Sequence, residues 1–317
     1  MIDESTGRRF PDFFITGAMK SGTSTFYAIL SQHPRICGSV PKEPHFLSRD
    51  DLDAQGRYYL WEFPRRWREH DWEKRESELL EEYSALFRPE SEDQLLFEAS
   101  THYLESGKAA RRIARINPRA KLIFMLRNPV DRAYSHYWHW VKRGRAIYRF
   151  EDQLKLETPA ILEIGRYARH LRTYFELFDR EQMAFVIFER LKKQPERELA
   201  GVLEFLGLEL PEGEDALDLE LTRNPSVVPR SLAAQLWFNR FQRLHMAKQL
   251  TANTIERERD HRNPLYFGIE KLWRKLNLTT RRYPPMRAET RELLAEYYRR
   301  ENAGLSDLIG IELEEYW

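Results

Sequence analysis

Short apolar runs alternate with amphipathic stretches along most of the chain. Four runs rich in aliphatic and aromatic residues predict buried strands: Phe13 to Thr16, Leu95 to Ala99, Lys121 to Leu126 and Met183 to Phe188. Stretches with helical periodicity stand between them, and this alternation is typical of parallel βαβ units. We therefore predict an α/β fold in which a doubly wound parallel sheet is flanked by helices.

The helix after the third predicted strand has the clearest end signals. Asn128 can cap its N-terminus, Pro129 suits its first turn and Gly144 can end it. Further helices are predicted from Lys108 to Asn117, around Tyr167 to Phe178 and from Pro195 to Leu206. Beyond Pro211 the pattern predicts helices and loops without another strong strand, so Leu232 to Trp317 is interpreted as a C-terminal helical cap.

Length leaves one or two domains open, because 317 residues exceed a typical domain but fit one α/β enzyme with a large sheet. The sequence has no internal repeat, low-complexity tract or Gly/Ser linker that would mark a boundary. We predict a single domain over residues 1–317. Its core spans about residues 10–210, and the helical cap, with substrate and nucleotide loops, spans about residues 211–317.

Composition limits the class of protein and its partners. With 42% hydrophobic, 13% aromatic and 32% charged residues, the chain is too apolar for a disordered protein and too charged for a membrane protein. Lys and Arg total 51 against 50 Asp and Glu, a net charge of +1, so no overall field attracts DNA or RNA. We expect a soluble globular protein with no nucleic-acid partner, in which any anion site is local.

Three features favour the cytoplasm. The longest apolar runs fall far short of the roughly 20 residues of a membrane span. Met1 to Phe10 carries acids and arginines and lacks the apolar core of a signal peptide. The single cysteine, Cys37, has no partner for a disulfide or a zinc cluster.

A glycine-bearing turn joins the first predicted strand to the first helix. Such a turn presents backbone N–H groups and a positive helix end to an anion, so residues 17–24 form a candidate phosphate cradle. In nucleoside triphosphatases a Lys follows the second Gly, but here Gly22 is followed by Thr23 and the Lys is Lys20. Arg127 stands at the end of the third strand, where a magnesium-binding Asp is expected. The pattern indicates an anionic group bound by protein cations without a metal.

A second constellation strengthens this prediction. Arg127 at a strand end and Ser135 in the following helix belong near the C-terminal edge of the sheet, where α/β folds bind ligands. A guanidinium and a hydroxyl can together hold a second phosphate.

Two segments carry a family resemblance. Residues 15–25, ITGAMKSGTST, resemble the 5′-phosphosulfate loop of sulfotransferases that use 3′-phosphoadenosine 5′-phosphosulfate (PAPS), and residues 126–137, LRNPVDRAYSHY, resemble their 3′-phosphate motif. Between them, residues 42–46, KEPHF, resemble the acceptor-side motif of the heparan sulfate type and its bacterial relatives. Weaker similarity covers most of the chain, through residues 97–100, 165–167, 224–226, 229–231 and 283–285.

The resemblance implies a P-loop-like fold, PAPS as the sulfuryl donor and 3′-phosphoadenosine 5′-phosphate (PAP) as its product. The implied phosphosulfate contacts are the Lys20 side chain and the backbone of Ser21, Gly22, Thr23, Ser24 and Thr25. Arg127 and Ser135 are implied at the 3′-phosphate, and Arg230, on a late loop, at the same nucleotide. Glu43 is the implied general base. Sulfuryl transfer needs a proton removed from the acceptor and charge neutralised on the leaving phosphate, and Lys20 suits the second task.

The sequence departs from the family pattern in two places. Heparan-type enzymes often carry a Lys where this chain has Ala99, so either Lys42 supplies that cation or none is needed. Cytosolic small-molecule sulfotransferases use a His base near this strand, which makes His102 a rival to Glu43, although we favour Glu43. His45 either orients the acceptor or the leaving oxygen, or packs in the core.

The acceptor is less sharply defined. Aromatic residues between the Glu43 motif and the second strand either stack on sugar, contact lipid or pack in the core: Tyr58, Tyr59, Trp61, Phe63, Trp67 and Trp72. Residues 57–76 hold six Lys/Arg against five Asp/Glu, so this segment forms no basic groove for a polyanionic glycosaminoglycan. A neutral or amphiphilic acceptor is favoured, such as a carbohydrate, a glycolipid or another small amphiphile.

Residues 240–282 are basic, with eleven Lys/Arg, four Asp/Glu and a local net charge of +7. Apolar residues recur at helical spacing in and just before this stretch: Leu236, Trp237, Phe241 and Leu244, then Ile269, Leu272, Trp273 and Leu276. Basic amphipathic helices bind anionic membranes, although a cap helix with a solvated basic face gives the same pattern. Residues 232–282 are therefore a candidate for peripheral contact with the inner membrane surface.

These observations together favour a PAPS-dependent sulfotransferase that modifies a hydroxyl, or as second choice an amine, of a carbohydrate, glycolipid or other small amphiphilic acceptor. A P-loop kinase or nucleoside triphosphatase is the alternative enzyme. A non-catalytic nucleotide-binding or membrane-docking module is the alternative from another class. The oligomeric state stays open.

Overall fold

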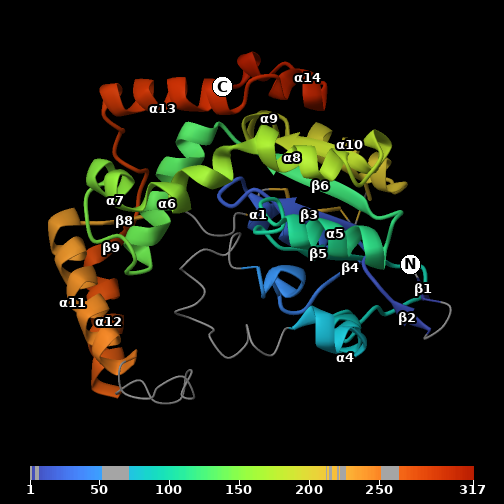
Figure 1. Cartoon of the computed structure of the whole chain (residues 1–317), viewed down its shortest axis with the longest axis horizontal. Helices are drawn as coiled ribbons and strands as arrows, with labels where there is room; N and C mark the ends of the chain where they lie inside the picture. Colours follow the sequence, from blue (N-terminus) through green and yellow to red (C-terminus); the bar gives the residue numbers. More distant parts are fainter. Residues whose placement is uncertain are drawn as a thin grey trace. The chain divides into compact units, whose positions relative to one another are not determined.

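The computed structural model describes residues 2–3, 7–51, 71–211, 213, 216–219, 221, 226–250 and 264–317. It contains a five-stranded sheet in the order β4-β5-β3-β6-β7, and Figure 1 labels β4, β5, β3 and β6. Every neighbouring pair of strands in this sheet is parallel. The strands are β3 (Phe13–Gly17), β4 (Ile36–Gly38), β5 (Leu95–Ala99), β6 (Lys121–Leu126) and β7 (Met183–Ile187).

The four predicted strands and the parallel α/β arrangement are confirmed, because both faces of the sheet are buried. All five residues of β3 are buried. Alternate residues of β6 enter opposite hydrophobic clusters: Leu122 and Phe124 one, Ile123 and Met125 the other. A strand that is buried on both faces appears in the sequence as a continuous apolar run, and such runs are the pattern from which these strands were predicted.

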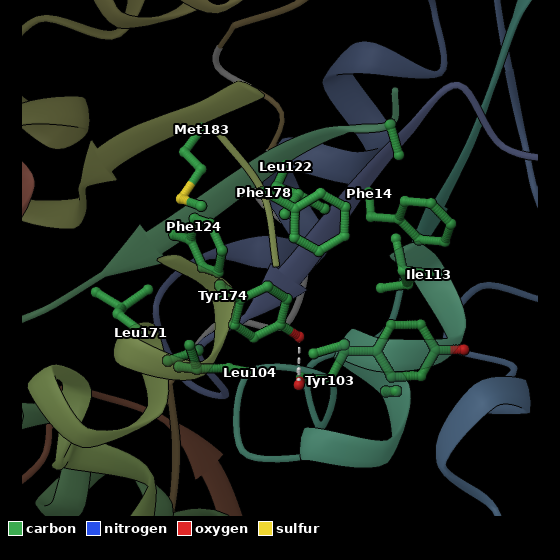
Figure 2. Packing of buried hydrophobic residues seen from close by; sticks show 14 of the residues in the cluster. Phe14, Tyr103, Leu104, Ile113, Leu122, Phe124, Leu171, Tyr174, Phe178 and Met183 are labelled. Atoms are coloured by element: carbon green, nitrogen blue, oxygen red, sulfur yellow. Dashed lines mark hydrogen bonds between the residues drawn. The ribbon is translucent and has the colours of Figure 1, made fainter. Parts of the chain in front are cut away.

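Helices cover each face of the sheet, as a doubly wound fold requires. The first cluster includes Ile113 of α5 (Gly107–Ile116) and Tyr174 of α8 (Tyr167–Phe175). Figure 2 shows these side chains against the strand residues, with the Tyr174 hydroxyl donating to the Tyr103 carbonyl oxygen at 2.6 Å. The second cluster includes residues of α1 (Thr23–Leu30) and α10 (Pro195–Leu206). The predicted helices in this region are confirmed.

The chain divides into two compact units. The first comprises Met1–Arg132, Ile164–Asn224 and Tyr297–Trp317, and the second comprises Ala133–Glu163 and Pro225–Glu296. The sheet lies in the first unit. The single domain expected from the sequence, with its core of about residues 10–210, stays a prediction.

The second unit is mainly helical. It contains most of α6 (Pro129–Lys142), then α7 (Phe150–Leu162), α11 (Leu232–Leu250), α12 (Pro264–Asn277) and most of α13 (Ala288–Glu301). The buried Asn239 amide on α11 donates to the carbonyl oxygens of Val141 and Ala146, at 3.1 and 2.7 Å. The helical character expected after Pro211 is confirmed. Two three-residue strands, β8 (Val227–Pro229) and β9 (Leu278–Thr280), pair antiparallel here and were not expected.

The end signals of α6 are confirmed. The Asn128 side-chain oxygen accepts hydrogen bonds from the backbone N–H groups of Val130 and Asp131, at 3.0 and 3.2 Å. The helix starts at Pro129, and Gly144 follows its end with φ of 78°, in the left-handed region. A short polar cap and a glycine past the last turn therefore set both ends.

The remaining elements are short or peripheral. They are β1 (Ile2–Asp3), β2 (Arg8–Arg9), α4 (Trp72–Ser84), α9 (Phe188–Lys193), α14 (Leu305–Ile309) and the 3-10 turns Phe46–Ser48, Glu163–Gly165, Arg180–Gln182 and Leu313–Glu315. Across the described residues, no helix combines the length and the apolar character needed to cross a membrane.

Gly17, the last residue of β3, has no room for a side chain. Its φ is 140°, and a Cβ built there would lie 2.7 Å from the Thr101 carbonyl oxygen. We predict that Gly17→Ala lowers the free energy of unfolding by about 2 kcal/mol or more, because the backbone of β3 or of residue 101 must shift.

Gly201 is the matched control. It lies inside α10, and a Cβ there would meet nothing within 4 Å. Gly201→Ala should raise the free energy of unfolding by up to about 1 kcal/mol, through helix propensity. Urea denaturation of both variants tests the pair, and equal stability changes would contradict the close approach at Gly17.

Candidate active site

The loop between β3 and α1, residues 17–24, is called the phosphate loop below. Gly22 is the N-cap residue of α1, with φ of 90°, and among the described side chains none caps this end. The first turn of α1 contains no acidic residue. The Thr25 N–H donates to the Gly22 carbonyl oxygen at 3.1 Å. The N–H groups of Thr23 and Ser24 before it have no preceding carbonyl group within the helix, and the helix dipole makes this end positive. The loop can therefore bind an anion.

Arg127 joins the two predicted phosphate motifs. It follows β6 directly, and its Nη1 donates to the Lys20 carbonyl oxygen at 3.0 Å. Its guanidinium carbon lies 4.7 Å from the centre of the Phe188 ring. The structure thus brings Lys20 and Arg127 together at the C-terminal edge of the sheet, where their motifs were expected to meet.

Phe188 and Glu189 contact the candidate site and were not predicted from the sequence. A Cβ on Gly22 would lie 3.0 Å from the Phe188 ring, so this ring contacts the phosphate loop and Arg127. The Glu189 carboxylate accepts from the Asn128 backbone N–H at 3.1 Å and from the Trp317 indole at 3.3 Å. The available signal was their place directly after β7, because side chains at strand ends line the ligand edge of such sheets.

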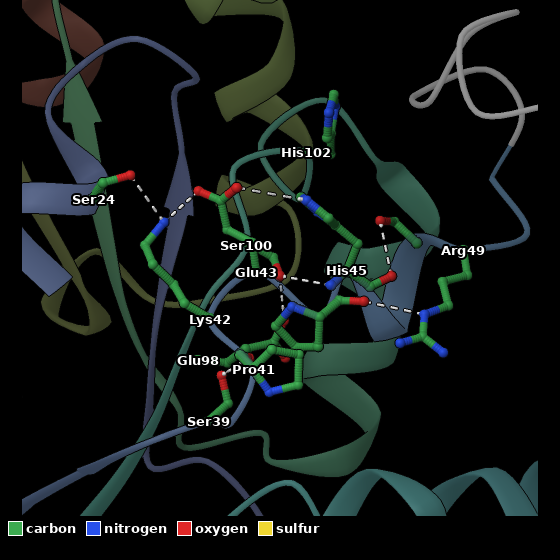
Figure 3. Close-up of polar contacts among 12 residues, drawn as sticks. Ser24, Ser39, Pro41, Lys42, Glu43, His45, Arg49, Glu98, Ser100 and His102 are labelled. Carbon is green, nitrogen blue, oxygen red and sulfur yellow. Dashed lines mark hydrogen bonds and ion pairs between the residues drawn. The ribbon is translucent and has the colours of Figure 1, made fainter. Parts of the chain in front are cut away.

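Glu43 is joined to the phosphate loop through Lys42. The Lys42 ammonium donates to the Ser24 hydroxyl oxygen at 3.3 Å and forms an ion pair with the Glu43 carboxylate (Figure 3). The Glu43 side chain is 32% exposed, and its backbone is left-handed with φ of 57°. The carboxylate is accessible and fixed beside the first helical turn of α1.

A buried carboxyl group supports the loop that carries Glu43. Ser100 Oγ accepts from the His45 backbone N–H at 3.0 Å and donates to the Glu98 carboxylate, which also accepts from the Tyr83 hydroxyl. Burial raises the pKa of Glu98, while the hydrogen bonds from Ser100 and Tyr83 act in the opposite direction. The Leu47 backbone N–H donates to the Tyr103 hydroxyl oxygen at 2.9 Å and forms a second attachment of the loop.

Two histidines lie next to Glu43. His45 Nε2 is 3.9 Å from Glu43 Oε2, and the His45 and His102 ring centres are 5.0 Å apart. Burial, and after it the neighbouring His102, Lys42 and Arg49, lowers the pKa of His45 well below 6.5. His45 is therefore neutral near neutral pH. His102, the alternative base, therefore lies in the same cluster as Glu43. It is paired with a different acid, because its Nδ1 lies 2.5 Å from Glu105 Oε1.

Ser135 and Arg230 belong to the second unit, whereas Lys20, Glu43 and Arg127 belong to the first. Ser135 is buried within α6. Arg230 follows β8, is exposed, and its backbone N–H donates to the Asn277 carbonyl oxygen at 2.6 Å. Their roles at the 3′-phosphate side of a nucleotide stay predictions.

Most of the aromatic residues considered for the acceptor lie outside the described residues: Tyr58, Tyr59, Trp61, Phe63 and Trp67. Trp72 is described and buried at the start of α4. It meets the Phe46 ring edge-on with ring centres 6.0 Å apart, and the Arg112 guanidinium lies 4.7 Å from its centre. Trp72 therefore packs in the core.

Comparison with known proteins identifies relatives of this arrangement. A family model described as "Sulfotransferase family" matches residues 11–212. The Homo sapiens bifunctional heparan sulfate N-deacetylase/N-sulfotransferase 2 is 28% identical over 223 residues, covering 65% of this chain and 23% of that protein. The Mus musculus heparan sulfate glucosamine 3-O-sulfotransferase 6 is 29% identical over 208 residues, covering 63% of this chain and 53% of that protein. The match thus spans only about a quarter to a half of these relatives' length.

A solved structure shares the fold along nearly the whole chain. The crystal structure of a sulfotransferase from Alicyclobacillus acidocaldarius superposes with a TM-score of 0.62 at 24% identity, covering 97% of this chain and 99% of that one. The range that the family model matches, residues 11–212, contains the phosphate loop, Glu43 and Arg127. Because the family model matches more than half of the chain, the protein belongs to the sulfotransferase family.

Proposed function

We propose that the protein transfers the sulfuryl group of PAPS to a hydroxyl group of a carbohydrate or lipid-linked acceptor, with Glu43 as the general base. The observation that carries the proposal is the pair of contacts made by Lys42, which reaches both Ser24 on the phosphate loop and the Glu43 carboxylate. A donor held at the loop and an acceptor bound at Glu43 would be neighbours. That closeness is the first requirement of a direct transfer between them.

The residues around the loop fit the donor. PAPS carries a phosphosulfate and a 3′-phosphate, and it supplies the activated sulfuryl group. The uncapped end of α1 and the Lys20 side chain suit the phosphosulfate, and Arg127 suits a phosphate through its planar set of donors. The backbone from Ser21 to Thr25 completes the proposed phosphosulfate site. Ser135 and Arg230 are proposed for the 3′-phosphate side.

The proposed reaction is an in-line displacement. The acceptor oxygen forms a bond to sulfur while the bond between sulfur and the bridging phosphate oxygen breaks, and PAP leaves. Glu43 accepts the acceptor proton, and Lys20 with the helix end stabilises the charge that develops on the leaving phosphate. Lys42 holds the base in position, and neutral His45 orients the acceptor or leaving oxygen.

The acceptor is proposed to be a carbohydrate, a glycolipid or another small amphiphile. The relatives named above include a heparan sulfate N-sulfotransferase and a heparan sulfate glucosamine 3-O-sulfotransferase, which supports a sugar acceptor. The near balance of charge in residues 57–76 favours a neutral sugar over a polyanionic one. A hydroxyl is proposed ahead of an amine.

Glu43→Gln tests the base. The amide keeps the shape of the side chain but accepts no proton, so transfer should fall by about a hundredfold to ten-thousandfold, while PAP affinity stays within about twofold. Turnover of labelled PAPS over an acceptor panel and calorimetric titration with PAP measure the two quantities. His102→Asn is the matched comparison. Normal transfer by Glu43→Gln together with loss in His102→Asn would assign the base to His102.

Arg127→Ala tests the donor site. Loss of a charge-assisted contact to phosphate should weaken PAP binding by about tenfold to a hundredfold. Arg180→Ala is the control, because Arg180 likewise lies over an aromatic ring, that of Phe185, and donates to a carbonyl oxygen, that of Met183. Both variants lose a stacked guanidinium, but Arg180→Ala should keep PAP affinity. Equal affinities for PAP in the two variants would contradict the assignment.

The protonation of His45 gives a pH-dependent prediction. Its pKa is lower in the folded protein than the ordinary 6.5, so the unfolded chain binds the proton more tightly. The free energy of unfolding should therefore decrease as pH falls below 6.5, and His45→Asn should make that decrease shallower. Nitrogen NMR of the imidazole should show His45 still neutral at about pH 6. Titration at or above 6.5 would contradict the prediction.

A further inference from the structure

Helices α11 and α12 form an antiparallel pair within the second unit. The Phe238 and Trp273 rings stack with centres 4.9 Å apart, and the Trp273 indole N–H donates to Gln235 Oε1 at 3.0 Å. Nearer the start of α11, the Ser231 carbonyl oxygen accepts from the Asn277 amide at 3.4 Å. The contacts run in opposite order along the two helices, so the helices are antiparallel.

One side of this pair carries exposed apolar side chains. Trp237 and Phe241 on α11 and Ile269, Leu272 and Leu276 on α12 are each at least 46% exposed. The spacing within each set is three or four residues, which places each set on one face of its helix. The Trp237 and Phe241 rings also stack on each other, with centres 6.2 Å apart.

Helical geometry places the two sets on the same side. Around its own helix axis, each exposed set is rotated by roughly a quarter turn from the residues that contact the other helix. Those contact residues are Gln235 and Phe238 on α11 and Trp273 and Asn277 on α12. Because the helices are antiparallel, these two rotations place both exposed sets on the same side of the pair. The buried Asn239, which donates to the carbonyl oxygens of Val141 and Ala146, lies on the opposite side of α11. Trp237, Phe241, Ile269, Leu272 and Leu276 are together called the apolar face below.

The exposed charges on α11 and α12 themselves are positive. Helix α11 contains no Asp or Glu, and α12 contains only Glu270, whose side chain is 12% exposed and paired with Arg274 at 2.8 Å. Lys271 and Lys275 are exposed on α12, one turn apart and beside the apolar residues. Arg240 on α11 is directed elsewhere, because its Nε donates to the Ile147 carbonyl oxygen at 2.9 Å and its guanidinium lies 5.2 Å from the centre of the Tyr148 ring. No exposed carboxylate on either helix opposes an anionic partner.

We propose that the apolar face is the surface by which the protein docks on an anionic lipid bilayer. A helix pair with exposed Trp, Phe, Leu and Ile on one side and lysines at its edge matches the chemistry of the interface, where apolar side chains enter the acyl boundary and cations meet lipid phosphates. The pair would lie in the plane of the membrane and not cross it. This inference is independent of the proposed sulfuryl transfer, because vesicle binding needs neither donor nor acceptor.

Charge argues for lipid over a second copy of the chain. In a two-fold dimer the same patch meets itself, so Lys271 and Lys275 would be brought toward their own counterparts without an exposed acid on α11 or α12 to offset them. A polyanionic sugar or nucleic acid would satisfy the cations but leave the apolar side chains in water. An anionic bilayer satisfies both.

Vesicle co-sedimentation of the full chain tests the proposal. Wild-type protein should bind phosphatidylcholine vesicles that contain phosphatidylglycerol, bind pure phosphatidylcholine vesicles much less, and lose affinity as salt rises. Lys271→Gln with Lys275→Gln should weaken binding to the anionic vesicles by about tenfold or more. Ile269→Ser with Leu272→Ser should weaken it by about tenfold or more through loss of buried apolar area.

Matched variants elsewhere on the surface are the controls. Leu156→Ser with Leu293→Ser removes exposed apolar side chains from α7 and α13, and Lys74→Gln with Lys155→Gln removes exposed cations. These variants should bind vesicles as wild type does. All variants should keep the wild-type melting temperature and PAP affinity, which separates this proposal from the proposed function.

Two results would overturn the proposal. The first is vesicle binding that is absent in the wild type or unchanged in both apolar-face and lysine variants. The second is a wild-type dimer, seen by sedimentation equilibrium, that becomes monomeric with Ile269→Ser and Leu272→Ser while vesicles are not bound. That second outcome would assign the apolar face to another copy of the chain.

Discussion

The burial of β3 on both faces and along both edges is the constraint on which the rest of the structure depends. Its five residues are inaccessible to solvent, and it pairs with β5 on one side and β6 on the other. The polar side chain of β3, Thr16, is itself buried, so the accessible polar groups gather where the strand ends. Gly17 lies there, closely packed against the Thr101 carbonyl, and the phosphate loop begins there. The ends of β5, β6 and β7 supply the residues that surround that loop.

The buried acid Glu98 connects the end of β5 to the loop that carries Glu43. Glu98 lies on β5, one position before the end of the strand, and its carboxylate accepts from Ser100 and Tyr83. Removing a carboxyl group from water is costly unless hydrogen bonds replace the lost solvent. Here one of the replacement hydrogen bonds comes from Ser100, whose hydroxyl oxygen also accepts from the His45 backbone N–H. The loop that carries Glu43 is thus attached to the sheet by the same interactions that make the burial of Glu98 tolerable.

Much of the fold could be predicted from the sequence, because fully buried strands and capped helices leave strong local signals. Asn128, Pro129 and Gly144 set the ends of α6 where expected. The edge strand β4 and the pair β8 and β9 have three residues each, too few for a periodic pattern, and they depend on partners distant in sequence. At the site, Lys20, Glu43 and Arg127 were found from motifs. Phe188 and Glu189 were missed because an aromatic residue and an acid after a strand have no distinctive local pattern.

The Arg127 side chain is already restricted by contacts within the folded protein, before any ligand binds. Its guanidinium is held between the Phe188 ring and the Lys20 carbonyl oxygen by contacts within the protein itself. Ordering a long flexible side chain costs up to about 2 kcal/mol of rotamer freedom. Because folding already restricts this side chain, a phosphate bound there as proposed would meet a donor set that needs little further ordering, and the affinity of the proposed site would be correspondingly less reduced.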